Sequence, residues 1–199
     1  MQPNYYAKTE FNGKETYYPV SPDGKLGLNV SPRPIGILST NALEISVSIA
    51  NITAIFAPDA KKITSYLCLI NELYASKCET LELSYNVGMK VLFAPQVKSL
   101  ICRHSGIAII SAPNATYLDV TGNEVKELNA PMAKEIIADD NPFLTKIYAP
   151  LAEKVSAKQE IKEIELFAPN ASISEDDGSR LCAGGALKHE IINPLLMFN

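Results

Sequence analysis

Apolar and small residues recur along most of the chain in units of 18 or 19 residues. The dipeptide Ala-Pro marks the period, with Ala75-Ser76 in place of one copy, and the small residue two places after the Pro-type position is taken as position 1 of a unit. The units then begin at Ala42, Ala60, Cys78, Val97, Ala115, Ala133, Ala152 and Ala171. A fixed period of this kind is the signature of a solenoid, in which similar coils stack and each contacts its neighbours.

Each unit carries apolar residues at positions 4 and 6 and again near positions 11 and 14. The clearest copy has Leu118, Val120, Val125 and Leu128, with Asn123 at position 9. The alternation at positions 4 and 6 is typical of a half-buried strand. We therefore expect positions 4 and 6 to point inward and positions 3, 5 and 7 to point outward.

The pattern L-x-x-L-x-L-x-x-N-x-L resembles that of leucine-rich repeat proteins, most closely the short-repeat bacterial subclass that includes effectors of pathogens. The resemblance covers about residues 25–172. It implies a β-rich solenoid, a leucine-rich repeat horseshoe with a parallel concave sheet and an extended, Pro-containing convex side. In the family the Asn bonds neighbouring backbone, and here it is present only at Asn86, Asn123 and Asn141.

Two other solenoids compete with this interpretation. A left-handed β-helix is the main rival, because 18 residues equal three hexapeptides, but steps of 19 residues break a hexapeptide frame. A helical solenoid fits less well, because a unit this short that contains Pro has no room for two helices.

The two ends of the chain depart from the repeat. Residues 1–24 are predicted to form a β-hairpin cap, because Asn12-Gly13 is the favoured two-residue hairpin turn. Residues 25–173 form the solenoid, and residues 174–199 are predicted to cap the last coil with Leu195, Leu196, Met197 and Phe198. The alternative is that this apolar tail is an exposed partner motif.

Composition excludes several functions. The chain is 47% hydrophobic with a net charge of −4, which argues against a disordered chain and against a nucleic-acid binder. No apolar run reaches membrane-spanning length, and no secretion signal opens the sequence. Two His leave little material for a metal site, so we expect no metal and no cofactor. Four Cys without a C-x-x-C pair indicate a reducing compartment.

The predicted concave face gathers aromatic, basic and apolar side chains near its middle. Tyr and Arg dominate the energetics of protein interfaces, and exposed apolar side chains favour a covering partner. Isolated surface aromatics are also ordinary, however, and stabilise sheets across strands. Asp119, Asp139 and Asp140 form an acidic flank that either steers a basic partner or is simply solvated. The predicted partner-binding residues are Tyr66, Tyr85, Ile101, Arg103, His104, Tyr117, Asp119, Ile137, Asp139 and Asp140.

These observations predict a non-enzymatic scaffold that binds another protein on its concave sheet. The resemblance implies an effector or an inhibitor of a partner enzyme, located in the cytoplasm or delivered into a host cell by a specialised secretion system. One alternative is a small enzyme that uses Cys182 and His189. Another is a carbohydrate-binding module built on the Tyr row. The sequence fixes neither the partner nor the oligomeric state.

Overall fold

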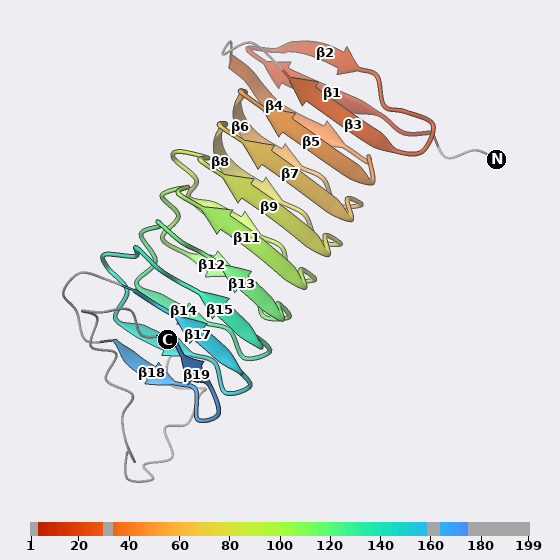
Figure 1. The fold of residues 1–199 in the computed structure, drawn as a ribbon. Coiled ribbons are helices and arrows are strands. Elements are labelled where there is room, and N and C mark those ends of the chain that lie inside the picture. Colours follow the sequence, from red (N-terminus) through yellow and green to blue (C-terminus); the bar gives the residue numbers. More distant parts are fainter. Residues whose placement is uncertain (1–3, 30–33, 159–163, 175–199) are drawn as a thin grey trace.

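The computed structural model describes residues 4–29, 34–158 and 164–174. Within these ranges all regular structure is β-strand, and the coils stack side by side from the N-terminal end to the C-terminal end (Figure 1). No helix in this part of the chain is long and apolar enough to cross a membrane. The described chain is therefore a β-solenoid with parallel sheets.

One side of the solenoid is a nine-stranded sheet in which every neighbouring pair is parallel. In the units that begin at Ala42 to Ala152, its strands lie within repeat positions 3 to 7, where the alternating pattern predicted them. In order along the sheet they are β3 (Lys25–Asn29), β5 (Glu44–Ser48), β7 (Lys62–Tyr66), β9 (Thr80–Ser84), β11 (Ser99–Arg103), β13 (Tyr117–Asp119), β15 (Glu135–Ile137), β17 (Lys154–Ser156) and β19 (Ser172–Ile173). The predicted concave surface corresponds to the outer face of this sheet.

The opposite side consists of strands as well, whereas the sequence predicted an extended segment there. Its first part is a seven-stranded sheet, with β1 (Ala7–Phe11), β2 (Lys14–Tyr18), β4 (Pro34–Thr40), β6 (Asn51–Phe56), β8 (Leu69–Tyr74), β10 (Val91–Phe93) and β12 (Ile110–Ser111). Its second part is a three-stranded sheet of β14 (Glu127–Asn129), β16 (Lys146–Tyr148) and β18 (Glu165–Phe167). A left-handed β-helix built from hexapeptides would have three strands in each coil, whereas the coils here have one strand on each of two sides.

The Ala-Pro dipeptides lie in tight turns that lead from one side of the solenoid to the other. In the first complete unit, the N–H of Ala60 donates to the carbonyl of Ala57 across Pro58 and Asp59 at 3.2 Å. The same bond closes the turn Ala75–Cys78, in which Ser76 replaces Pro, and the Ala-Pro turns Ala94–Val97, Ala112–Ala115, Ala130–Ala133, Ala149–Ala152 and Ala168–Ala171. Pro suits the second place of such a turn because its φ is fixed near −65° and it has no N–H to satisfy.

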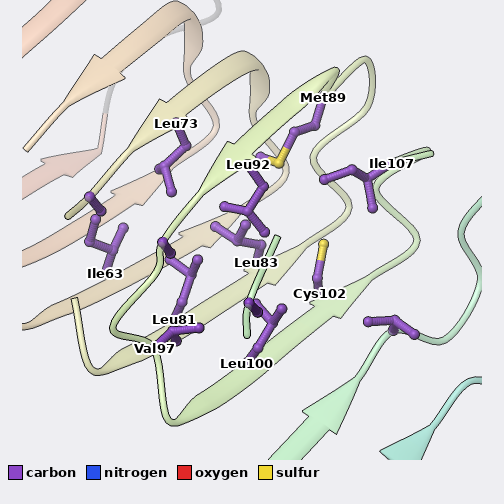
Figure 2. Packing of buried hydrophobic residues seen from close by; sticks show 14 of the residues in the cluster. Ile63, Leu73, Leu81, Leu83, Met89, Leu92, Val97, Leu100, Cys102 and Ile107 are labelled. Atoms are coloured by element: carbon purple, nitrogen blue, oxygen red, sulfur yellow. The ribbon is translucent and has the colours of Figure 1, made fainter. Parts of the chain in front are cut away.

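Apolar side chains of the two sides meet in one continuous core. Figure 2 shows Leu81 and Leu100 of the nine-stranded sheet and Leu73 and Leu92 of the seven-stranded sheet pointing into the space between the sheets. The inward positions 4 and 6 are buried in every complete unit, as predicted. They are Ile45, Val47, Ile63, Ser65, Leu81, Leu83, Leu100, Cys102, Leu118, Val120, Ile136, Ala138, Val155 and Ala157.

The two ends of the stack differ from its middle. β1 and β2 form an antiparallel hairpin at Asn12 and Gly13, both of which have positive φ, as a type I′ turn requires. At the other end, the unit predicted to start at Ala171 is displaced by one residue, because Ile173 pairs with Val155. The predicted C-terminal cap lies in residues 175–199, outside the described part of the chain.

Candidate interaction surface

Aromatic rings line the outer face of the nine-stranded sheet where its central strands end. We call Tyr66, Tyr85, His104 and Gly122 the strand-end row. The Tyr85 ring stacks on the imidazole of His104, with centroids 5.1 Å apart and planes 16° apart. Tyr66 meets Tyr85 edge to face at 5.9 Å. The row is therefore a packed cluster of rings and not a set of independent surface residues.

Tyr85, His104 and Gly122 owe their place in the row to an unusual backbone conformation at repeat position 8, whereas Tyr66 lies at position 7, at the end of β7. Left-handed φ values between 48° and 56° occur there in residues other than Gly, a conformation that L-residues rarely adopt. Each such residue donates its N–H to the next coil, as Tyr85 does to the carbonyl of Arg103 at 2.9 Å. The position-8 residues with positive φ are Ile49, Leu67, Tyr85, His104, Gly122 and Asp140. The turn aims these side chains away from the core, beside the strand ends.

Buried Asn side chains at position 9 hold the turns in place. Asn123 accepts from the N–H groups of Ser105 and Ile107 through Oδ1, at 3.0 and 3.3 Å. Its Nδ2 donates to the carbonyls of Cys102 and Val120. Asn86 and Asn141 donate to backbone carbonyls of their own coil and the preceding one. The amide side chain thus replaces backbone partners that a strained turn would otherwise leave buried and unpaired.

An ion pair lies beside the row. Arg103 donates from Nε to Asp119 Oδ2 at 2.7 Å and also bonds it through Nη2. Asp119 Oδ1 accepts from the hydroxyl and the N–H of Thr121. The hydrogen bond to Asp119 raises the pKa of Arg103 above its ordinary value. Arg103 remains half-exposed while Asp119 is buried, so the carboxylate fixes the guanidinium in place at the surface.

Five of the ten predicted site residues are exposed on the outer face, and these are Tyr66, Tyr85, Arg103, His104 and Asp140. Four are half-buried, and these are Ile101, Tyr117, Ile137 and Asp139. Burial, followed by the nearby charge of Asp119, raises the pKa of Tyr117. The structure thus keeps nine of the ten open to solvent at least in part.

The predicted acidic flank needs correction. Asp119 is 1% exposed and paired with Arg103, so its charge does not face an approaching partner. Asp139 accepts from the Ser156 hydroxyl and the Lys158 N–H at 2.7 and 2.8 Å. Position 5 was predicted to be open, but the Arg103 side chain of the adjacent strand covers it at Asp119. Only Asp140 presents the free acidic surface that the steering hypothesis requires.

The thiols of Cys78 and Cys102 are poor nucleophiles. Burial raises the pKa of Cys78 to about 11 and that of Cys102 to about 12. A thiol that stays protonated at neutral pH is unreactive. No group of three or more His, Cys, Asp or Glu able to hold a metal ion occurs in the described residues. Cys182 and His189, the pair of the enzyme hypothesis, lie outside that part of the chain.

A second aromatic cluster, on the opposite side of the solenoid, was missed by the sequence analysis. Phe56 and Tyr74 stack with centroids 4.9 Å apart, and Phe93 continues the row from Tyr74 at 6.5 Å. Tyr148 and Phe167 stack in the same way on the three-stranded sheet at 5.3 Å. The available signal was the residue before each Ala-Pro or Ala-Ser, which is aromatic in these five units.

Comparison with known proteins adds no assignment. No family model matches the chain, and no curated protein or solved structure matches it significantly.

Proposed function

We propose that this chain is a non-enzymatic scaffold that binds a partner protein on the outer face of its nine-stranded sheet. The observation that carries the proposal is the strand-end row together with Arg103. Tyr85 and His104 are exposed although they stack on each other, and Arg103 is held beside them by a buried carboxylate. Such a fixed aromatic and Arg cluster is the composition of an interface hot spot, and its side chains lose little entropy on binding.

The arrangement of the rings favours a protein over a sugar. Tyr85 stacks on His104, and Tyr66 meets Tyr85 with the ring planes nearly perpendicular, so the three rings do not form one flat surface. A sugar-binding platform needs an open aromatic face against which a sugar ring lies flat. Side chains of a partner protein, in contrast, fit between rings and pair with Arg103.

We also propose that the solenoid is of the leucine-rich repeat type. The support is the buried Asn123, whose amide bonds the backbone of its own and the preceding coil, together with the alternating strand pattern. The bacterial subclass with this repeat includes effectors. On that basis, we propose that the chain acts by occupying a surface of a partner enzyme, either in the cytoplasm or after delivery to a host cell.

An affinity capture with matched variants tests the proposed surface. The immobilised chain is compared with Tyr85→Ala and with Phe56→Ala, and captured proteins are quantified by mass spectrometry. Phe56 is a close control, because it is 40% exposed against 46% for Tyr85 and stacks on Tyr74 on the opposite side. We expect a partner whose capture falls at least about tenfold with Tyr85→Ala and stays constant with Phe56→Ala.

The opposite result is equally clear. Partners lost with Phe56→Ala and kept with Tyr85→Ala would assign binding to the other side of the solenoid. Equal capture by all three proteins would remove the strand-end row from the binding surface. Thermal unfolding of each variant establishes that a lost partner reflects the surface and not a lost fold.

A further inference from the structure

The sheet on the side opposite the nine-stranded sheet is interrupted between two neighbouring coils. β12 is the last strand of the seven-stranded sheet, and the strand of the following coil, β14, begins the three-stranded sheet. β12 pairs with β10 on one side and with no strand on the other. An edge strand therefore lies in the middle of the stack, where every other described coil junction on this side is paired.

The backbone hydrogen bonds between coils differ at the junction of β12 and β14. Ala75 and Ala130 donate their N–H groups to the carbonyls of Phe93 and Tyr148 in the next coil, at 3.0 and 2.9 Å. Ala112 has the same place in its unit, and no backbone bond joins it to Asn129 among the described residues. Ala94 likewise has no such bond to Ser111, but there the strands themselves pair, whereas β12 and β14 do not. The two coils are still linked at one end of the gap, where Glu124 donates to the carbonyl of Ile107 at 3.1 Å.

The gap uncovers part of the core. Ile110 corresponds in register to Leu92, which is 3% exposed, yet Ile110 is only half-buried. Its neighbour Ile109 is 73% exposed, the largest value among the exposed large apolar side chains described. A hollow of about 590 Å³ lies here, within the range of ligand-binding clefts. It is lined by residues 108–113 on one side and by Lys126, Glu127 and Asn129 on the other.

The orientation of the backbone specifies what fits the hollow. Alternate residues of a strand direct their N–H and C=O groups to opposite neighbours. In the preceding coils, the residue equivalent to Ser111 accepts from the coil before it, as Phe93 does from the N–H of Ala75. By the same alternation, the N–H and C=O of Ile110 and the N–H of Ala112 face the gap. The hollow therefore combines unpaired backbone groups, apolar side chains and the polar side chains of Lys126 and Glu127. These groups match an extended peptide with alternating apolar and polar side chains.

We propose that the free edge of β12 binds an extended segment of a partner protein, which adds to the seven-stranded sheet as its eighth strand. The backbone of that segment pairs with Ile110 and Ala112. Its inward side chains cover Ile110, and its outward side chains lie beside Lys126 and Glu127. This site is on the side opposite the strand-end row and does not depend on the function proposed for that row.

A short synthetic peptide of alternating Thr and Val, flanked by Lys and labelled with fluorescein, is the probe. Its binding to the full chain is measured by fluorescence anisotropy, and amide hydrogen exchange locates the bound segment. The same peptide with N-methyl groups on alternate amides is the control for backbone pairing. The variant Ile109→Asp alters the groove, and Val87→Asp is its matched control, because Val87 is 63% exposed in the preceding coil.

We expect saturable binding that slows amide exchange at Ile110 and Ala112 and disappears with the N-methylated peptide. Ile109→Asp should weaken it about tenfold or more, and Val87→Asp should change it less than about twofold. The Tyr85→Ala variant should bind this peptide normally, which separates this site from the strand-end row. The proposal is overturned by absent binding, by equal binding of the N-methylated peptide, or by protection confined to other strands.

Discussion

The imidazole of His104 occupies the space that a side chain at Gly122 would need. A Cβ atom built at Gly122 would lie 2.1 Å from His104 Nδ1, far inside van der Waals contact. Gly122 also has a φ of +69°, which suits Gly because it has no Cβ. The absence of a side chain at this position thus lets His104 lie flat against the next coil, with Tyr85 stacked on it.

Replacing Gly122 by Ala is expected to lower the free energy of unfolding by more than backbone strain alone would. Gly106→Ala is the matched control, because Gly106 has a similar φ of +65° and nothing within 4 Å of its virtual Cβ. Positive φ costs an L-residue about 1–2 kcal/mol, and we expect that loss for Gly106→Ala. Gly122→Ala should lower the free energy of unfolding by about 1 kcal/mol more, since the His104 ring must move away from the new side chain. Urea unfolding measures both.

A second substitution separates the two contributions at Gly122. In a His104→Ala background the ring is gone, so Gly122→Ala should cost no more than Gly106→Ala. A full additional penalty in that background would show that His104 is not the obstacle.

Removing the guanidinium of Arg103 should destabilise the fold as well as change the surface. Arg103→Ala leaves the buried Asp119 carboxylate with Thr121 as its remaining partner. Hydrogen bonds to charged groups contribute about 1.5–3 kcal/mol, and we expect a loss in that range. The Arg103→Ala, Asp119→Ala double variant should recover part of it, because no unpaired charge remains. Chemical denaturation of the three variants measures this coupling.

This pair also changes how binding is tested. A combined Tyr85→Ala and Arg103→Ala variant would remove this contact together with the surface ring, so lost binding could follow from lost stability. The structure gives Arg103 a structural contact, so Tyr85→Ala alone is the cleaner probe.

Much of the solenoid follows from local patterns in the sequence. The period places every strand of the nine-stranded sheet from β5 to β17, because alternation at positions 4 and 6 determines which side chains are buried. The opposite side was harder to predict. There the apolar positions shift between units of 18 and 19 residues, and Ala-Pro is compatible with both an extended segment and a turn. Strands such as Asn51–Phe56 depend on pairing between coils, which no single unit encodes.

The site was predicted less completely, for a related reason. Alternation correctly placed Tyr66 and Arg103 on the outer face. It could not show that Arg103 reaches the adjacent strand and covers Asp119, because that contact depends on side-chain length across a strand pair. The stacking of Tyr85 on His104 depends on left-handed backbone at non-Gly residues, which has no sequence signature.

The buried amide of Asn123 should be among the most sensitive polar groups of the solenoid. Asn123→Ala leaves the N–H groups of Ser105 and Ile107 and the carbonyls of Cys102 and Val120 without this partner. Each buried group left unpaired costs about 1–3 kcal/mol, so we expect a total loss of about 3 kcal/mol or more after relaxation. Asn129→Ala, at an exposed position six residues later, should change stability by less than about 0.5 kcal/mol. Similar losses for both variants, measured by urea unfolding, would contradict the structural role of Asn123.

Stability should fall at alkaline pH because of the buried thiols. The folded state raises the pKa of Cys78 to about 11 and that of Cys102 to about 12, from an ordinary value of 9.0. Below pH 9 both states hold these protons, and the stabilisation is complete. Above pH 9 the unfolded chain loses them first, so the free energy of unfolding decreases until the folded thiols ionise near pH 11 to 12.

Urea unfolding under reducing conditions at pH 7.5 and pH 10 measures this loss. Each thiol should contribute about 1–2 kcal/mol to the decrease, given about 1.36 kcal/mol per pKa unit. Lys and Tyr groups also titrate toward pH 10, so the readout is the difference from a Cys78→Ala, Cys102→Ala variant. That variant starts from lower stability because the core loses two sulfur atoms, but its decrease with pH should be smaller. An equal decrease in both proteins would mean that the two thiols ionise as readily in the folded chain as in the unfolded one.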